Sequence, residues 1–301
     1  MVASETQLQA WSNAPASQKL QHTHEQIRRA LNQSEALRGR SFDIYLQGSY
    51  ANSTNIRADS DVDVVVELTS TFHHDLSKLS YDQKQVFHQT YPNATYHWAD
   101  FHRDVLSALN TYFGAGSAQA GNKSVKLAGN DSRVNADIVP CLEHRQYASF
   151  STWNRSDFVR GIKFWTKAET PNREIVNFPK VHIENGESKN AIHRTNTMYK
   201  GTARVVKNIK RQLVDNHGLN PKLAPSYFLE CAIYNVPDGH FRTDFKGSLE
   251  NALNFILREC NPATLLTASH QHFLFGTEPW QWNQQDAGAF FGFAEEFYNS
   301  N

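Results

Sequence analysis

Asp61 and Asp63 are the residues whose type and spacing most directly suggest chemistry. They lie in the run Ser60–Glu67, and the side chains of a strand alternate between its two faces, so both carboxylates share one face. The opposite face is apolar and consists of Val62, Val64, Val66 and Leu68. Two carboxylates this close repel unless a cation lies between them, and Mg²⁺ prefers hard oxygen ligands. The pair predicts a two-metal phosphoryl-transfer site, although Asp-x-Asp alone also fits a solvated strand edge.

A small residue and a hydroxyl precede this pair. Gly48 and Ser49 follow the alternating strand Phe42–Leu46, where backbone N–H groups could cradle a phosphate. A polar loop over residues 50–59 joins the two motifs. Gly-Ser, a short spacer and Asp-x-Asp entering a valine run together resemble the nucleotidyltransferases of the DNA polymerase β type.

A third carboxylate is expected at Asp137, in the run from Arg133 to Pro140. Asn135, Asp137 and Val139 share one face of this strand, and we expect Pro140 to end it or to mark a sheet edge. The alternative is a half-buried strand with one satisfied aspartate. Because the other two motifs are present, the catalytic interpretation is favoured.

These residues need a sheet and helices to position them. Helical patterns cover residues 4–38, predicted as one long leading helix, and residues 98–112, which end at Gly114. Residues 124–127 and 133–140 flank a turn-rich break and predict a hairpin that carries Asp137, and residues 161–165 predict a further strand. The predicted class is therefore α+β, with a mixed sheet backed by helices.

The second half of the chain is predicted to be helical. Residues 166–196 are polar and are interpreted as a junction, so the predicted domains are a catalytic lobe over 1–165 and a helical lobe over 166–301. From Met198 a helical pattern carries a basic stripe of Lys200, Arg204, Lys207 and Arg211. This stripe is either a solvated face or a grip for a nucleotide triphosphate. Ser226 opens another helix, either as part of an ordinary cap or as part of an anion site.

Composition excludes several classes of protein. Lys plus Arg and Asp plus Glu number 30 each in 301 residues, so the formal charge is zero and long nucleic acid is a poor expectation for a partner. The three cysteines favour neither a disulfide framework nor a zinc module, and zinc is not expected from the histidines. No secretory leader or apolar membrane span is found in the sequence, which makes the cytoplasm the expected location.

With these motifs placed, the chain resembles the bacterial cyclic GMP-AMP synthase/DncV-like nucleotidyltransferases, relatives of animal cyclic GMP-AMP synthase and oligoadenylate synthase. The resemblance spans nearly the whole length and includes the stretches "ADIVPC", "NFPKVHIENGESKN", "YKGTARVVKNIK" and "PSYFLECAIYNVP". It implies a polymerase β-like lobe, an all-helical second lobe and an active site in the cleft between them. The Cys/His zinc insertion of the animal DNA sensor is lacking in this sequence.

The resemblance also implies an activity. Asp61, Asp63 and Asp137 would bind two Mg²⁺ ions, with Mn²⁺ as an alternative. Substrate binding would fall to Gly48, Ser49, Arg204, Lys207 and Ser226. The expected reaction joins NTPs such as ATP and GTP into a cyclic oligonucleotide second messenger, expected to be a purine-containing dinucleotide such as cyclic GMP-AMP.

The same resemblance implies a role in anti-phage (CBASS) defence through an effector protein, with a monomer as the expected state. Two alternatives remain open at this point. One is nucleotide transfer to another acceptor, namely RNA, a drug or a protein, and the other is a catalytically silent nucleotide-binding regulator.

Overall fold

The computed structural model describes residues 3–15, 18–57, 61–153, 156–168 and 170–300. Residues 58–60, which include the end of the predicted polar loop and Ser60, lie outside this description. Contacts within the chain divide it into two compact units. The sheet unit comprises Ser17–Gln47 and Asp59–Pro179, and the helical unit comprises Met1–Ala16, Gly48–Ala58 and Lys180–Asn301.

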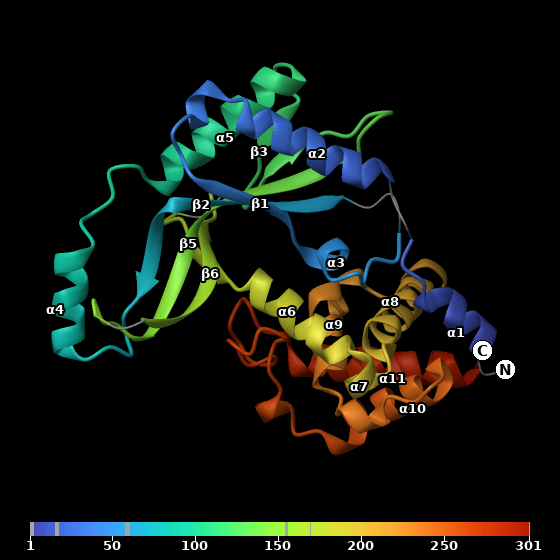
Figure 1. The fold of residues 1–301 in the computed structure, drawn as a ribbon. Coiled ribbons are helices and arrows are strands. Elements are labelled where there is room, and N and C mark those ends of the chain that lie inside the picture. The colour runs from blue at the N-terminus through green and yellow to red at the C-terminus, as the bar shows by residue number, and fades with distance from the viewer. Residues whose placement is uncertain (1–2, 16–17, 58–60, 154–155, 169, 301) are drawn as a thin grey trace. The chain divides into compact units, whose positions relative to one another are not determined.

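A seven-stranded mixed sheet forms the centre of the sheet unit (Figure 1). Its strands are β1 (Phe42–Leu46), β2 (Val62–Asp75), β3 (Ala118–Ala120), β4 (Val125–Leu127), β5 (Ala136–Ser149), β6 (Asp157–Trp165) and β7 (Glu174–Asn177). The order β1-β2-β5-β4-β3 forms one path, and β6 pairs with both β5 and β7. Only β2 and β5 run parallel to each other, and the other pairs are antiparallel.

Strand β2 is buried on the face that the sequence predicts to be apolar, because Val62, Val64, Val66 and Leu68 are all fully buried. The predicted hairpin is confirmed, since β4 pairs antiparallel with the start of β5. The prediction that Pro140 ends this strand is wrong. Strand β4 pairs with residues 136–138 of β5 and β6 with residues 142–149, so Pro140 lies between these two neighbours, where its missing N–H costs little.

Helices α2 (Gln18–Asn32) and α5 (Trp98–Phe113) pack against each other, and α5 packs on β5 (Figure 1). Trp98 Nε1 donates a hydrogen bond of 2.7 Å to the carbonyl of Pro140, and the Thr23 hydroxyl accepts one of 3.0 Å from the Val134 N–H. Helix α4 (Tyr81–Thr90) covers a small separate core that includes Phe87 and Tyr147. These contacts fix the strands that carry the predicted carboxylates.

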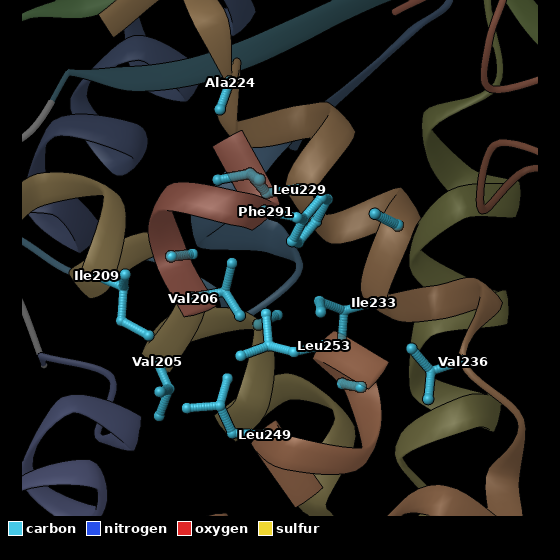
Figure 2. Close-up of a cluster of buried hydrophobic side chains, with 14 of the residues drawn as sticks. Val205, Val206, Ile209, Ala224, Leu229, Ile233, Val236, Leu249, Leu253 and Phe291 are labelled. Carbon is cyan, nitrogen blue, oxygen red and sulfur yellow. The ribbon is translucent and has the colours of Figure 1, made fainter. Parts of the chain in front are cut away.

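The helical unit is built around α8 (Met198–His217), against which α1, α9, α10 and α11 pack. Its other helices are α1 (Glu5–Ser12), α3 (Gly48–Ala51), α6 (Pro179–Asn190), α7 (Ile192–Thr195), α9 (Ser226–Asn235), α10 (Phe245–Asn254) and α11 (Gln284–Ser300). Short 3₁₀ or π segments in the chain are Glu35–Leu37, Pro221–Leu223, Asp238–His240, Phe255–Glu259 and Pro262–Thr264. Figure 2 shows part of the core, where Val206 of α8, Leu229 of α9 and Leu253 of α10 lie together.

The two units differ from the predicted domains of residues 1–165 and 166–301. The sheet continues past residue 165, because β7 pairs with β6, and the predicted junction holds α6 and α7 as well as β7. The predicted single leading helix is wrong, because α1 and α2 are separate and residues 13–15, including Pro15, are not helical. Helix α1 belongs to the helical unit, where Leu8 is buried and the Glu5 carboxylate accepts hydrogen bonds from the first N–H groups of α10.

Candidate active site

The structure brings the three predicted carboxylates together in the sheet unit. Asp63 of β2 and Asp137 of β5 are direct neighbours in the parallel ladder, so their side chains leave the same face of the sheet. Asp61 lies one residue before β2 and is exposed. Its carboxylate is close enough to raise the pKa of Asp63. The predicted spacing therefore produces a cluster of three carboxylates from two adjacent strands.

The electrostatics of this cluster favour a cation. Burial first, and then the nearby charges of Asp137 and Asp61, raise the pKa of the Asp63 carboxyl to about 6. A nearby cation would stabilise the ionised form of this carboxylate, because the group is largely shielded from water and lies beside two other negative charges. The three oxygen donors are the ligand type that Mg²⁺ and Mn²⁺ prefer.

Among the described residues, no group of three His, Cys, Asp or Glu side chains has the arrangement needed to bind one metal ion. The fit to Mg²⁺ therefore rests on the chemistry of the donor set and on the raised pKa of Asp63.

Two polar side chains that the sequence analysis did not assign to the site hold these carboxylates. Ser124 Oγ donates a hydrogen bond of 3.0 Å to Asp137 Oδ1, and Asn135 Nδ2 donates one of 3.1 Å to Asp61 Oδ1. Asn135 stands two residues before Asp137, so the strand period that found Asp137 also places Asn135 on the same face. Ser124 has only a weaker indication, its position one residue before the antiparallel partner strand β4.

Gly48 and Ser49 belong to the helical unit, in the single turn α3. Gly48 has a φ of 67°, a left-handed conformation that favours glycine. The Gly48 carbonyl accepts a hydrogen bond of 3.1 Å from the Asn52 N–H, and the Ser49 carbonyl accepts one of 2.8 Å from the Thr54 N–H. We call residues 48–54 the serine turn.

Lys207 is buried, with 4% of its surface exposed, and has internal partners. Its ammonium forms an ion pair with Glu230 Oε1 and donates hydrogen bonds of 3.1 and 3.0 Å to the carbonyl and hydroxyl of Thr54. The structure therefore joins Lys207 to the serine turn through Thr54. A role for Lys207 on the distal phosphates stays a prediction.

The basic stripe of α8 is not the solvated face that one interpretation expects. Lys200 is buried and forms an ion pair with Glu187, and the Arg204 guanidinium donates to the carbonyls of Ser12 and Ser53. Arg211, at the far end, is half-buried. Most of the stripe ties α8 to neighbouring segments of the helical unit.

Ser226 is the first residue of α9 and is exposed. Glu230 lies four residues further along, on the same face of the helix. The residues predicted to contact phosphates, from Gly48 to Ser226, thus all belong to the helical unit, whereas the three carboxylates all belong to the sheet unit. In the described part of the chain, no helix is long and apolar enough to cross a membrane.

Comparisons with known proteins show which family the chain resembles. A family model described as the cGAS/DncV-like nucleotidyltransferase C-terminal helical domain matches residues 184–299. The cyclic nucleotide synthase CdnE01 of Staphylococcus haemolyticus is 39% identical over 297 residues, covering 97% of this chain and 97% of that protein. The cyclic UMP-AMP synthase of Rhodothermus marinus is 39% identical, covering 99% of this chain and 98% of that protein.

Two solved structures are similar over almost the whole chain. The Rhodothermus marinus CdnE c-UMP-AMP synthase with Apcpp and Upnpp has a TM-score of 0.89 at 38% identity, covering 99% of this chain and 97% of that one. The Elizabethkingia meningoseptica CdnE cyclic dinucleotide synthase with GTP and Apcpp has a TM-score of 0.78 at 30% identity, covering 98% of each chain. The predicted α+β class, with a polymerase β-like sheet unit and a helical unit, is confirmed. The chain belongs to the cGAS/DncV-like nucleotidyltransferase family and is a nucleotidyltransferase.

Proposed function

We propose that this enzyme joins NTPs into a cyclic oligonucleotide second messenger and releases pyrophosphate. The observation that carries the proposal is the carboxylate cluster on paired strands, in a chain whose similarity to named cyclic nucleotide synthases extends over nearly its full length. Each bond forms when an acceptor hydroxyl attacks the α-phosphorus of a second NTP and the bond to pyrophosphate breaks. A second transfer of the same kind closes the ring.

The residues of this chain divide the work. Asp61, Asp63 and Asp137 would hold Mg²⁺, which supplies positive charge to the triphosphate and lowers the pKa of the attacking hydroxyl. Asp137 accepts the proton of that hydroxyl, and the Ser124 hydroxyl orients the Asp137 carboxylate for this task. Ser49 contacts the donor phosphates from the serine turn, and Lys207 and Ser226 contact the distal ones.

We further propose a purine-containing cyclic dinucleotide, such as cyclic GMP-AMP, as the product and anti-phage defence as the setting. The relatives from Rhodothermus and Elizabethkingia are named for products or crystallised with nucleotides that include a purine. The two relatives differ in the second base, so sequence identity alone does not select the second base of this enzyme's product. The product would act through a separate effector protein.

One reaction tests the proposal. The purified enzyme is incubated with all four NTPs and Mg²⁺, and phosphatase-resistant products are identified by mass spectrometry. We expect a cyclic dinucleotide without any added acceptor. Product that forms only when RNA, a drug or a protein is added would show that the acceptor assignment is wrong, and an all-pyrimidine ring would contradict the base assignment.

Variants connect the product to the cluster. Asp61→Ala and Asp63→Ala should abolish synthesis while folding is kept, because removal of a metal ligand also relieves repulsion between carboxylates. Asp131→Ala removes an exposed carboxylate from the turn before β5 and is the matched control, expected to keep activity. Turnover of Asp63→Ala at high Mg²⁺ that equals the control would exclude the cluster as the metal site.

A further inference from the structure

A buried carboxylate of the helical unit converges on the serine turn. Glu230 of α9 is 4% exposed, and each of its oxygens has a partner from that turn. Oε2 accepts a hydrogen bond of 3.1 Å from Asn52 Nδ2, and Oε1 accepts one of 2.6 Å from Thr54 Oγ1. Both partners are themselves buried, at 8% and 1% exposed. This set of contacts is not a surface cap but an internal junction.

The same two residues close the turn through their backbones. The Asn52 N–H bonds to the Gly48 carbonyl, and the Thr54 N–H bonds to the Ser49 carbonyl. Glu230 therefore binds the side chains of Asn52 and Thr54, and the N–H groups of these two residues bind the carbonyls of Gly48 and Ser49. In this way Glu230 helps to fix the position of Ser49. Ser53, which lies between them, has a φ of 54°, and its carbonyl accepts from the Arg204 guanidinium. A strained residue in such a turn needs external support to persist.

The charge of Glu230 is kept by its neighbours. Burial acts to raise the pKa of this carboxyl, but the Lys207 ammonium and then His182, whose Nε2 lies 3.5 Å away, lower the pKa to about 2. An ionised acceptor makes stronger hydrogen bonds than a neutral one. Glu230 thus acts on the turn with a full charge, and Lys207 compensates that charge while it also donates to Thr54.

We propose that Glu230 is a positioning residue, which holds the serine turn, and with it Ser49, in the conformation that binds the donor triphosphate. The inference rests on the proposed function for the role of Ser49, but the hold on the turn is a property of the folded chain alone. Glu230 itself touches no substrate in this proposal. Its effect reaches the reaction through Asn52 and Thr54.

The test uses three variants of the full chain. Glu230→Gln keeps the shape but removes the charge. Thr54→Val removes the hydroxyl that donates to Glu230 and accepts from Lys207, without changing any charge. Asp238→Asn is the matched control, because Asp238 forms a comparable ion pair with the buried Lys189 in the same unit and does not contact the turn. If Glu230→Gln fails to fold, Thr54→Val still tests the proposal.

Two measurements are made on each variant. Amide hydrogen exchange of peptides covering residues 48–57, without nucleotide, should be about tenfold faster in Glu230→Gln and Thr54→Val than in the wild type, and unchanged in Asp238→Asn. The KM for NTP should rise about tenfold in Glu230→Gln, with kcat within about threefold, since the hydrogen bonds removed involve an ionised acceptor. If the loss of any ion pair simply loosened the helical unit, Asp238→Asn would also show faster exchange over residues 48–57.

The outcomes separate this inference from the proposed function. Unchanged exchange over residues 48–57 in both variants overturns the positioning role, whatever the activity. The same exchange increase in Asp238→Asn also overturns it, because the effect would then be a global loosening. A wild type that makes no nucleotide product, with the local exchange increase still present, leaves the hold on the turn standing and overturns the proposed function instead.

Discussion

At the scale of single residues, Asp63 of the predicted site is ionised at an electrostatic cost. It is confined by the parallel ladder beside Asp137, and burial comes before the charges of Asp137 and Asp61 among the causes that raise its pKa to about 6. The folded chain therefore binds a proton at Asp63 more tightly than the unfolded chain, whose carboxyl has a pKa of 3.8. Ionisation of Asp63 favours unfolding when no cation is bound.

The first prediction follows from that sign. In EDTA, the free energy of unfolding of the wild type should fall relative to that of Asp63→Asn as the pH rises from about 4 to 6. The fall should be at most about 3 kcal/mol, and the difference between the two proteins should stay constant above about pH 6. Denaturant titrations across pH 4–8 measure it, and added Mg²⁺ should narrow the difference. Asp131→Asn is the control, and profiles of wild type and Asp63→Asn that stay parallel would contradict the prediction.

Lys207 and Arg211 separate two roles of the basic stripe. We expect Lys207→Ala to raise the KM for NTP more than Arg211→Ala does, because Lys207 contacts the serine turn through Thr54. Lys207→Ala also removes the ammonium that pairs with the buried Glu230 carboxylate, which should lower the free energy of unfolding by about 3–5 kcal/mol. Steady-state kinetics and denaturation on both variants test this. Lys207 has only a structural role if neither variant changes the KM and Lys207→Ala alone loses much stability.

The carboxylates could be predicted from the sequence because a strand imposes a strict period of two on adjacent side chains. Glu230 could not be, since its partners in the serine turn lie 176 and 178 positions earlier in the chain and nothing local marks a glutamate in an apolar helix as the centre of a network. The environment of the α8 stripe could not be predicted for the same reason. Whether Lys200 is solvated depends on Glu187, which belongs to a segment interpreted as a polar junction.

At the scale of elements, the sheet shows where local patterns suffice. The hairpin of β4 and β5 and the strand at residues 161–165 were predictable from β-branched runs and turn residues. Strand β7 is short and partly exposed, and exists because β6 offers it an edge. Helix α6 carries one local indicator, Pro179 at its first position, but its sequence has almost no apolar periodicity.

Gly161 in β6 provides the prediction at this scale. A Cβ at this position would lie 2.7 Å from the Asn177 carbonyl and 2.8 Å from the Phe178 ring, so the chain after β7 approaches β6 where only glycine fits. Gly161→Ala should lower the free energy of unfolding of the sheet unit by about 1–3 kcal/mol. The midpoint of denaturant unfolding measures it.

Gly288 is the matched control for this substitution. It lies inside α11 with nothing within 4 Å of the position of an added Cβ. Gly288→Ala should be neutral or stabilising by up to about 1 kcal/mol, because alanine favours the helix. Equal effects of the two substitutions would show that the approach of residues 177 and 178 does not constrain β6.

At the scale of the whole molecule, charge bears on how the enzyme is controlled. Lys plus Arg equals Asp plus Glu, and most of the basic stripe on α8 is engaged inside the helical unit. Four further arginines, Arg28, Arg29, Arg38 and Arg40, are close together in the sequence, in α2 and just after it. Arg38 forms an ion pair with Glu35, and the Arg40 guanidinium lies 3.7 Å from the centre of the Tyr96 ring. Arg28 and Arg29 are exposed on α2.

We therefore predict that double-stranded DNA or RNA changes the rate of product formation less than about twofold at physiological salt. Strong binding of a long duplex requires several phosphate contacts, each of which adds to a steep dependence on salt concentration, and these four arginines, two of which are engaged with Glu35 and Tyr96, supply few of them. Control is then expected from a partner protein, a small ligand or relief of inhibition.

Rates are measured with and without duplex at low and physiological salt, for the wild type and for a variant in which the four arginines are replaced. Arg258→Ala, which breaks a surface ion pair with Glu295, is the control. A salt-sensitive increase in rate that disappears only in the four-arginine variant would overturn the prediction and make this surface a nucleic-acid sensor.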